Sequence, residues 1–363
     1  MATTSWGVPD IQGSWTNASL TRLQRGFGAS QLVMSPEEVT KAEQQDYYNN
    51  RFDEEKKPSD TSDTRLLDGT DLLQGSGYNV FWIDPGNRVG VVQGEARSSW
   101  ITEPADGRIP YKNRPAPRQQ TEPPQTAAEE RRIVGAGDSK VAPGRMAFAG
   151  PQGFSSVARA SGGGAGGYGS YDGPENRTLA DRCLLGFGTV GGPVMSNVMY
   201  NNNYHIVQTP GHVMILVEMV HDARIAPVFS SAAEARSAFQ AGSPPKWLGE
   251  SVAWYEGSEL VVETRNVDPR QRGYLSPTGI LIERFSRWKS DELVYAFEVN
   301  DPSLYTQAWK GEQVMRPARA SLYEYACHEG NYAMVGILAG ARRLERDGLD
   351  VENNADEEGG GGQ

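Results

Sequence analysis

Residues 323–332, which read YEYACHEGNY, concentrate side chains that can carry a proton. The ten positions hold three Tyr, two Glu, one His and one Cys. Acid–base catalysis needs a proton donor and a proton acceptor held against the substrate, and His, Glu and Tyr are among the residues that fill these roles. We therefore predict that Tyr323, Tyr325, His328 and Glu329 are catalytic.

A second cluster follows an apolar run, in the segment VEMVHDARI. If this segment continues as one strand, alternation places Glu218, Asp222 and Arg224 on one face. Burial raises the pKa of a carboxyl group and a neighbouring Arg lowers it, so this face could hold groups that titrate near neutral pH. We predict that these three residues bind substrate, with an ion-pair ladder on a solvated face as the alternative. His221 falls on the opposite face unless a bulge intervenes; it is predicted to be catalytic, with a structural histidine as the alternative.

The run YNNNY and two arginines supply further candidates for ligand contacts. Amides and phenols can hydrogen-bond a ligand, and a guanidinium can grip a carboxylate with two parallel hydrogen bonds. The predicted substrate-binding residues are therefore Tyr200, Asn202, Tyr204, Arg182 and Arg284. Turn chemistry, in which Asn side chains bond their own backbone, is the alternative for the run. Arg284 shares a strand face with Ile280 and Ile282, which favours an inward side chain.

Metal binding would require ligands from separate strands, because the chain has no HxH, HExxH or CxxC motif. A set formed by His221, Asp222, His328 and Glu329 is conceivable, but we predict no metal and no cofactor. Nucleophilic catalysis is not predicted either. Cys327 and His328 are adjacent, so their side chains point apart, and the chain has no Gly-x-Ser-x-Gly elbow.

The composition narrows the partners and the compartment. The formal net charge of −11 argues against nucleic acid, whose phosphates are bound by clustered Lys and Arg. No window approaches the ~18 continuous apolar residues of a membrane span, and the N-terminus does not resemble a signal peptide. Two Cys do not make a disulfide framework, so we predict free thiols, with Cys327 a small buried hydrophobe. These features predict a cytoplasmic protein; a homo-oligomer remains open.

Local signals predict two helices and several hairpins. Ser35 followed by Glu38 is a capping-box pattern for a helix that begins in SPEEVTKAEQQ, and a second helix is expected over about 331–346. Residues 77–110 favour a hairpin or short meander, with turns near Pro85-Gly86-Asn87 and Asp106-Gly107. Farther along, YHIVQ with VMILVEMVHDARIAPV, SVAWYEG with SELVVETRNV, and ILIERFSRW with ELVYAFEVND read as three consecutive hairpins, followed by a strand in YTQAWKGEQVM.

Three successive hairpins predict a mainly β fold, an antiparallel meander that closes into a lipocalin-like barrel with a cavity for a small ligand. We expect residues 1–112 to add a helix and a hairpin to this barrel, whose main part is 177–350. Residues 113–176 are rich in Gly and Pro and predict a low-complexity insertion, and residues 351–363 an acidic disordered tail. The stretch SGGGAGGYG in the insertion lacks the Lys-Ser/Thr ending of a phosphate loop.

The segments GSWTNASLTRL, FWIDPGNRV, DRCLLGFG, YNNNYHIVQ, VMILVEMVHDARI, WLGESVAWYEGSELVVET, ERFSR and YEYACHEGNYAM together resemble a bacterial family of largely uncharacterised proteins. The resemblance covers nearly the whole chain outside 113–176 and implies a lipocalin-like β-barrel. The chain is also similar to cofactor-independent decarboxylases of lignin-derived phenolic acids. The resemblance assigns no residue to an established catalytic role.

The leading hypothesis is a cofactor-independent lyase, a decarboxylase of a phenolic or other aromatic acid bound in the barrel. In such chemistry a p-hydroxyaryl acrylate is protonated beside its carboxyl group, and the resulting quinone methide loses carbon dioxide. The alternative is a non-catalytic binder of lipocalin type that carries a hydrophobic small molecule. A third possibility is a hydrolase or a metal-dependent lyase.

Overall fold

The computed structural model describes residues 3–26, 29–46, 85–112, 171–186, 192–271, 273–319 and 321–347. Most of the predicted insertion, the predicted tail and the strand expected in YNVFWID lie outside the described residues. Within them, the fold is mainly β. The strands are β1 (Gly13–Thr16), β2 (Val91–Val92), β3 (Glu95–Ala96), β4 (Ile101–Glu103), β5 (Asn203–Gln208), β6 (His212–Val217), β7 (Ala223–Phe229), β8 (Glu250–Glu256), β9 (Glu259–Arg265), β10 (Ile280–Lys289), β11 (Glu292–Asn300) and β12 (Trp309–Pro317).

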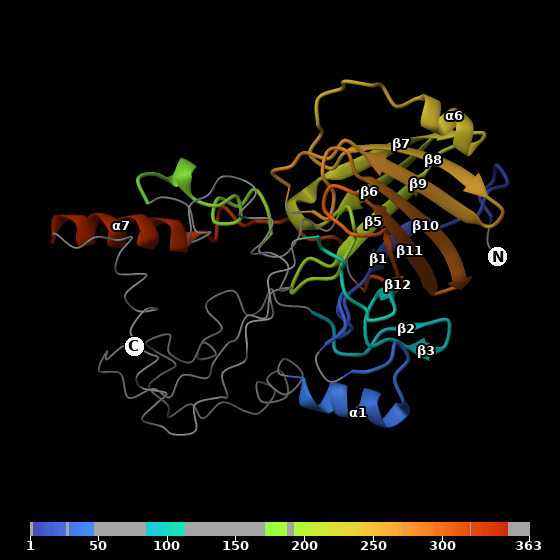
Figure 1. Cartoon of the computed structure of the whole chain (residues 1–363), viewed down its shortest axis with the longest axis horizontal. Helices are drawn as coiled ribbons and strands as arrows, with labels where there is room; N and C mark the ends of the chain where they lie inside the picture. Colours follow the sequence, from blue (N-terminus) through green and yellow to red (C-terminus); the bar gives the residue numbers. More distant parts are fainter. Residues whose placement is uncertain are drawn as a thin grey trace.

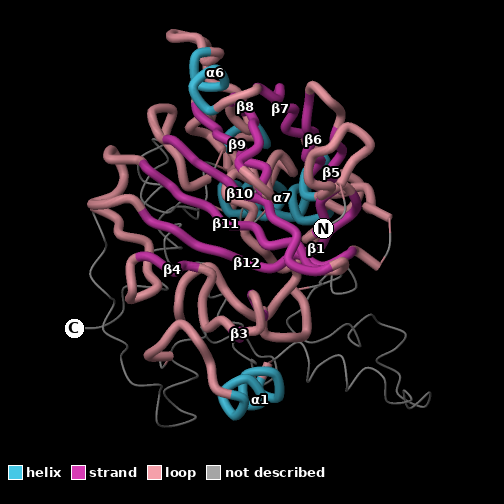
Figure 2. Tube along the Cα trace, turned by 90° about the vertical axis from the view of Figure 1, so that its right-hand side faces the viewer, coloured by secondary structure: helices cyan, strands magenta, loops and turns pink. Residues whose placement is uncertain are grey.

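Nine of these strands form a closed barrel (Figures 1 and 2). Their order is β1-β5-β6-β7-β8-β9-β10-β11-β12, and β12 pairs with β1 to close the ring, at Trp15↔Pro317 and Thr16↔Arg316. β4 lies beside β12, while β2 and β3 form a small separate ladder. The hairpins β5–β6, β8–β9 and β10–β11 confirm the three predicted from alternation.

The barrel is mixed, which corrects the purely antiparallel prediction. β7 and β8 run parallel and pair at Val228↔Ala253 and Phe229↔Trp254. The connection between them contains the helix α6 (Ala232–Ser237), which lies at the outer edge of the barrel in both views. A helical crossover returns the chain to the end from which it started, so the next strand runs in the same direction.

The segment predicted as one long strand is divided by a tight turn, so that prediction was wrong. β6 ends at Val217, a short 3-10 turn covers Met219–His221, and β7 begins at Ala223. Val220 and His221 have φ values of 65° and 46°, in the left-handed region that reverses the chain direction. Alternation therefore cannot be carried from β6 into β7, and the predicted shared face of Glu218, Asp222 and Arg224 does not form.

Large side chains fill the barrel interior. Trp309 is fully buried and meets the rings of Tyr274, Phe297 and Tyr305 edge-on, with centroids 5.6, 5.6 and 5.8 Å away. Such edge-to-face contacts add to the stabilisation that comes from burying the rings. This region is therefore a packed core and not part of an open cup.

Two longer helices lie outside the barrel wall. α1 (Pro36–Gln45) has the predicted capping box, in which Glu38 N donates to Ser35 Oγ and Ser35 N donates to the Glu38 carboxylate. α7 (Tyr332–Arg346) confirms the predicted C-terminal helix and extends away from the barrel (Figure 1). Among the described residues, no helix has the length and apolarity needed to span a bilayer.

Replacing Gly311 with Ala tests how tightly the interior is packed. A Cβ on Gly311 would lie 2.4 Å from Phe297 Cζ and 2.7 Å from the main-chain oxygen of Trp100. Because the backbone cannot give way cheaply, we expect Gly311→Ala to lower the free energy of unfolding by about 1–3 kcal/mol, measured by urea denaturation. Gly211→Ala is the control, since a Cβ there meets nothing within 4 Å. Equal stability of the two variants would show that the core adapts.

Candidate functional site

The predicted proton-carrying groups of residues 323–332 lie mostly at the surface. Tyr323 is 59% exposed, and His328 and Glu329 are also exposed. Tyr325 is half-buried, with its ring stacked on that of Tyr200 at a centroid distance of 6.5 Å, and burial followed by the nearby Tyr200 raises its pKa. A water-accessible position does not provide the low-dielectric surroundings in which such groups act most strongly. The catalytic roles predicted for these residues remain predictions.

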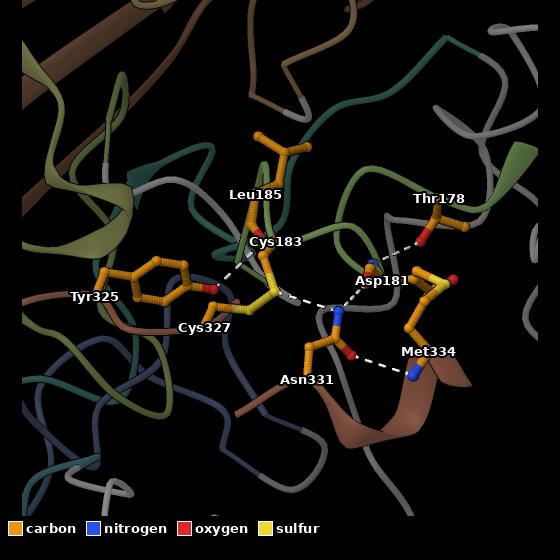
Figure 3. The surroundings of a disulfide bond; sticks show 8 residues. All are labelled: Thr178, Asp181, Cys183, Leu185, Tyr325, Cys327, Asn331 and Met334. Atoms are coloured by element: carbon orange, nitrogen blue, oxygen red, sulfur yellow. Dashed lines mark hydrogen bonds between the residues drawn. A yellow bond between two sulfur atoms is a disulfide. The ribbon is translucent and has the colours of Figure 1, made fainter. Parts of the chain in front are cut away.

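A disulfide between Cys183 and Cys327 shows that the prediction of free thiols was wrong (Figure 3). It links positions 144 residues apart in the sequence. Asn331, the N-cap of α7, reinforces the link by donating from Nδ2 to the Asp181 main-chain oxygen at 2.7 Å. The bond therefore attaches the C-terminal segment to residues 171–186. Arg182, in that same segment, donates to the Glu175 main-chain oxygen at 3.2 Å.

Glu218 brings the two predicted segments together. Its buried carboxylate accepts from Asn203 N at 3.1 Å and Asn203 Nδ2 at 2.7 Å, and from Tyr323 N at 2.8 Å. These bonds tie the C-terminal segment to β5. Asp222 accepts from Ala223 N at 2.7 Å, and His221 is exposed on the turn. The contacts of Glu218 and Asp222 are all to neighbouring main-chain or amide groups, as in a structural tie.

The YNNNY run divides into a turn and a strand. Asn202 is buried and bonds the main chain of Val198 twice, accepting from its N–H at 2.8 Å and donating to its oxygen at 2.9 Å. This is the turn chemistry considered as the alternative for the run. Tyr204, on β5, instead points into the barrel and is 1% exposed.

A buried polar cluster occupies the barrel interior beside Tyr204. Arg224 on β7 bonds Glu283 on β10 through both terminal nitrogens, one of them at 2.9 Å from Oε1. The hydroxyl of Tyr295 on β11 donates to the same Oε1 at 2.8 Å. The side chains of Arg224 and Glu283 are 1% and 0% exposed, and Tyr295 is fully buried. A bidentate guanidinium–carboxylate pair with a phenol is thus held away from water.

The surroundings of the cluster fix the protonation of its donors. Burial alone would lower the pKa of Arg224, but the charge and hydrogen bonds of Glu283 outweigh it and raise that pKa. Burial, followed by the charge of Glu283, raises the pKa of Tyr295 well above its usual value. Burial also raises the pKa of Tyr204. Both phenols therefore stay protonated near neutral pH and can donate hydrogen bonds.

The loop formed by residues 192–196 lies against this cluster. Met195 N donates to the Tyr295 hydroxyl at 3.2 Å, and Asn17 Nδ2 donates to the Met195 oxygen at 2.9 Å and to the Tyr204 hydroxyl at 3.4 Å. Gln313 also donates to the Met195 oxygen, and Gln271 donates to the Gly192 oxygen at 2.7 Å. Side chains from separate parts of the barrel thus hold the loop in place.

Several buried polar atoms around this loop have no hydrogen-bond partner among the described residues. They are Arg224 Nε and the side-chain oxygens Asn17 Oδ1, Gln271 Oε1 and Gln313 Oε1. A Cβ on Gly192 would lie 3.9 Å from Arg224 Nε, so the loop passes directly over that free N–H. Buried polar groups without partners are rare, and they mark a place where water or a polar ligand would be stabilised.

Glu283 and Tyr295 were not predicted as site residues, although the sequence contains a signal for both. In β10, Leu281, Glu283 and Phe285 alternate as buried residues. Tyr295 is buried opposite Phe285 in β11. A carboxylate among apolar positions of a strand is the mark of a buried polar site. The prediction that Arg284 points inward was wrong: it lies on the outer face, where it bonds Glu256 at 2.8 Å and Glu259 at 3.1 Å.

The described residues contain no group of three or more His, Cys, Asp or Glu side chains placed to hold a metal ion. The chemistry available at the cluster is hydrogen bonding and proton transfer by a guanidinium, a carboxylate and two neutral phenols. Such groups suit the binding of an anionic substrate and the movement of protons to and from it.

Breaking the disulfide should release the C-terminal segment. We expect Cys327→Ser to lower the free energy of unfolding by about 2–4 kcal/mol, because the unfolded chain is no longer constrained. Limited proteolysis should then cut between residues 321 and 347 sooner than in the wild type. His328→Ala, at the exposed neighbouring position, is the control. Unchanged cleavage of Cys327→Ser would mean that Glu218 and Asn331 hold the segment without the bond.

The buried ion pair should be far more sensitive to substitution than the exposed pair beside it. Arg224→Met leaves Glu283 buried without its partner, and we expect a loss of about 3–5 kcal/mol in the free energy of unfolding. Arg224→Met combined with Glu283→Leu should recover part of that loss, because no charge is then stranded. Arg284→Met, on the outer face, should cost less than about 1 kcal/mol. Similar losses at Arg224 and Arg284, measured by urea denaturation, would contradict the buried pair.

No protein-family model matches this chain, and no curated protein is significantly similar to it.

Proposed function

We propose that this protein is a cofactor-independent carbon–carbon lyase, a decarboxylase of an aromatic carboxylic acid of the lignin-derived phenolic type. The observation that carries the proposal is the Arg224–Glu283–Tyr295 cluster, with Tyr204 beside it, inside a closed barrel. A guanidinium recognises a carboxylate, a buried carboxylate carries protons, and low dielectric weakens the solvation that stabilises a substrate carboxylate. The barrel type that we propose with it is lipocalin-like.

Each group of the cluster has a role in this chemistry. Arg224 Nε, which lacks a protein partner among the described residues, would hold the substrate carboxylate, and the neutral hydroxyl of Tyr204 would orient it. The neutral hydroxyl of Tyr295 would position Glu283. Glu283, protonated from solvent water while the loop is open, would deliver that proton to the carbon next to the carboxyl group as the substrate phenol gives its proton to water. The carbon–carboxyl bond then breaks, its electron pair forms the new carbon–carbon double bond and returns the ring to a phenolate, and carbon dioxide leaves. The phenolate finally takes a proton from water.

Access to the cluster would require movement of the 192–196 loop. Arg224, Glu283 and Tyr295 are closed to solvent, and the loop covers Arg224 Nε. The loop is held by amide side chains that have unused oxygens, so a substrate that displaces it finds acceptors and donors already in place. Loop opening of this kind commonly controls entry and product release.

The closed packing also supports the runner-up, a non-catalytic binder of a hydrophobic small molecule. A buried ion pair inside a barrel can serve conformational specificity alone, without chemistry. Turnover separates the two functions. Tyr295→Phe should change ligand affinity little in either case, but in an enzyme it should also lower turnover, whereas a binder shows no turnover in any variant.

We also propose an oxidising compartment for the protein. Disulfides persist in secreted and periplasmic proteins and are rare in the cytoplasm. The thiol argument for a cytoplasmic location therefore no longer applies, since Cys183 and Cys327 are bonded to each other.

The test uses purified, chelator-treated protein and a panel of hydroxycinnamic and hydroxybenzoic acids. Turnover is followed by ultraviolet absorbance and by release of carbon dioxide. We expect Tyr295→Phe to reduce kcat by about 10²–10⁴-fold with little change in substrate affinity, because the hydroxyl that positions Glu283 is lost.

Tyr305→Phe is the matched control. Tyr305 is equally buried and its hydroxyl donates to the Tyr274 main-chain oxygen at 2.7 Å, away from Arg224 and Glu283. It should lose comparable stability and keep full activity. Ligand-induced stabilisation of the wild type without carbon dioxide release would reject the lyase and leave the binder.

A further inference from the structure

The pairing between β7 and β8 is short and leaves a seam between the N-terminal ends of these two strands. The two strands pair only at Val228↔Ala253 and Phe229↔Trp254. N-terminal to these pairs no further pairing is formed, and a cleft of about 540 Å³ is lined there by β7, by the start of β8 and by the crossover between them. A cleft of this volume falls within the range of ligand-binding pockets, about 300–1,000 Å³.

Pro227 explains why the ladder stops. In a parallel ladder the hydrogen bonds are evenly spaced, so the pairing of Val228 with Ala253 would continue with a bond from residue 227 N to the Ser251 oxygen. Proline has no N–H and cannot form that bond. The parallel pairing therefore ends at Pro227, and the seam opens on its N-terminal side.

The strand registers direct main-chain donors and acceptors toward the seam from both walls. Val217 N donates to the Asp222 oxygen and Val228 N to the Gly211 oxygen, which sets the parity of β7. By alternation, Ile225 directs its N–H and its oxygen toward β8. The two-residue turn that joins Glu256 to Glu259 sets the parity of β8 in the same way, so Ser251 directs its N–H and oxygen toward β7.

We propose that this seam binds an extended peptide segment, which adds as a short strand between Ile225 and Ser251. Each wall offers one N–H and one oxygen, so a small carboxylate would satisfy the N–H groups and leave the oxygens without partners. A peptide backbone supplies donors and acceptors in alternation and satisfies both. Exposed strand edges are recognised in this way in other β-augmentation complexes.

The side chains at the seam define the preferred sequence. Ile225 is 61% exposed on the outer side, and Phe239 and Trp247 also line the cleft, so outward positions of the peptide should be apolar. On the inner side, Ser251 Oγ lies 2.8 Å from Thr264 Oγ1, which favours small hydroxyl residues.

Charge at the wide end of the seam selects a basic residue. Asp222 and Glu250 both line the cleft there. Glu250 pairs with Lys246 at 3.0 Å, whereas Asp222 has no ion pair with any other part of the chain that the structure describes. The expected ligand is therefore an alternating apolar and hydroxyl segment that ends in Lys or Arg. Arg224 of the buried cluster also lines this cleft, so peptide binding is tested separately from lyase activity.

The probe is a fluorescein-labelled acetyl-Thr-Val-Thr-Val-Lys-amide, with binding to the full chain measured by anisotropy and hydrogen exchange. We expect saturable binding and slower exchange of the Ile225 and Ser251 amides. The same peptide methylated on both Val nitrogens keeps its side chains and loses donors, so it should bind at least about tenfold more weakly. Equal binding of the two peptides, or no binding, would overturn the proposal.

Pro227→Val tests the seam itself. The new N–H can bond the Ser251 oxygen and extend the ladder, so the new amide at position 227 should exchange slowly without peptide, and the affinity for the probe should fall about tenfold. Pro302→Val, at an exposed position in the turn after β11, is the control and should bind as the wild type does. If 4-hydroxycinnamate instead of the peptide protects Ser251, the cleft belongs to the enzyme and the peptide proposal fails.

Discussion

The ion pair between Arg224 and Glu283 is the interaction on which the interior of this protein depends. Two charges can be removed from water only if each finds a partner and its remaining hydrogen-bonding atoms are satisfied. Glu283 meets this condition with the guanidinium and the Tyr295 hydroxyl. Arg224 meets it except at Nε, which faces the 192–196 loop. The charges are therefore tolerated only if the closed barrel places Arg224 of β7, Glu283 of β10 and Tyr295 of β11 within hydrogen-bonding distance of one another.

The parallel pairing of β7 with β8 affects both the closure of the barrel and the length of the ladder between these two strands. The crossover through α6 places β8 beside β7, and so allows nine strands to close. Pro227 then limits this pairing to two positions. A barrel normally has no free strand edges. In this barrel two junctions, β7–β8 and β12–β1, pair at only two positions each, and the cleft between β7 and β8 lies at the first of them.

Prediction from the sequence succeeded where the signal is local. The hairpins follow from alternation and turn residues, and α1 from the capping box at Ser35 and Glu38. It failed where distant parts of the chain decide the outcome. Nothing in the sequence near Cys183 indicates its pairing with Cys327. The left-handed turn at Val220 was also missed, because it contains no Gly that would indicate a positive φ. The site was missed for a related reason, since burial of Glu283 depends on which face the closed sheet turns inward.

The richest concentration of titratable side chains is therefore not the strongest candidate for chemistry. His328 is surrounded by water, which would screen its charge and stabilise any ion formed near it. Glu283 lies where the same charges interact several times more strongly, and where two phenols remain neutral. The same burial closes the cluster to solvent. A ligand that enters must therefore replace the contacts that the amides around Met195 make with the loop. Displacing the loop would free the amide N–H groups of Asn17, Gln271 and Gln313, which now donate to loop oxygens, and these groups could then donate to a ligand carboxylate.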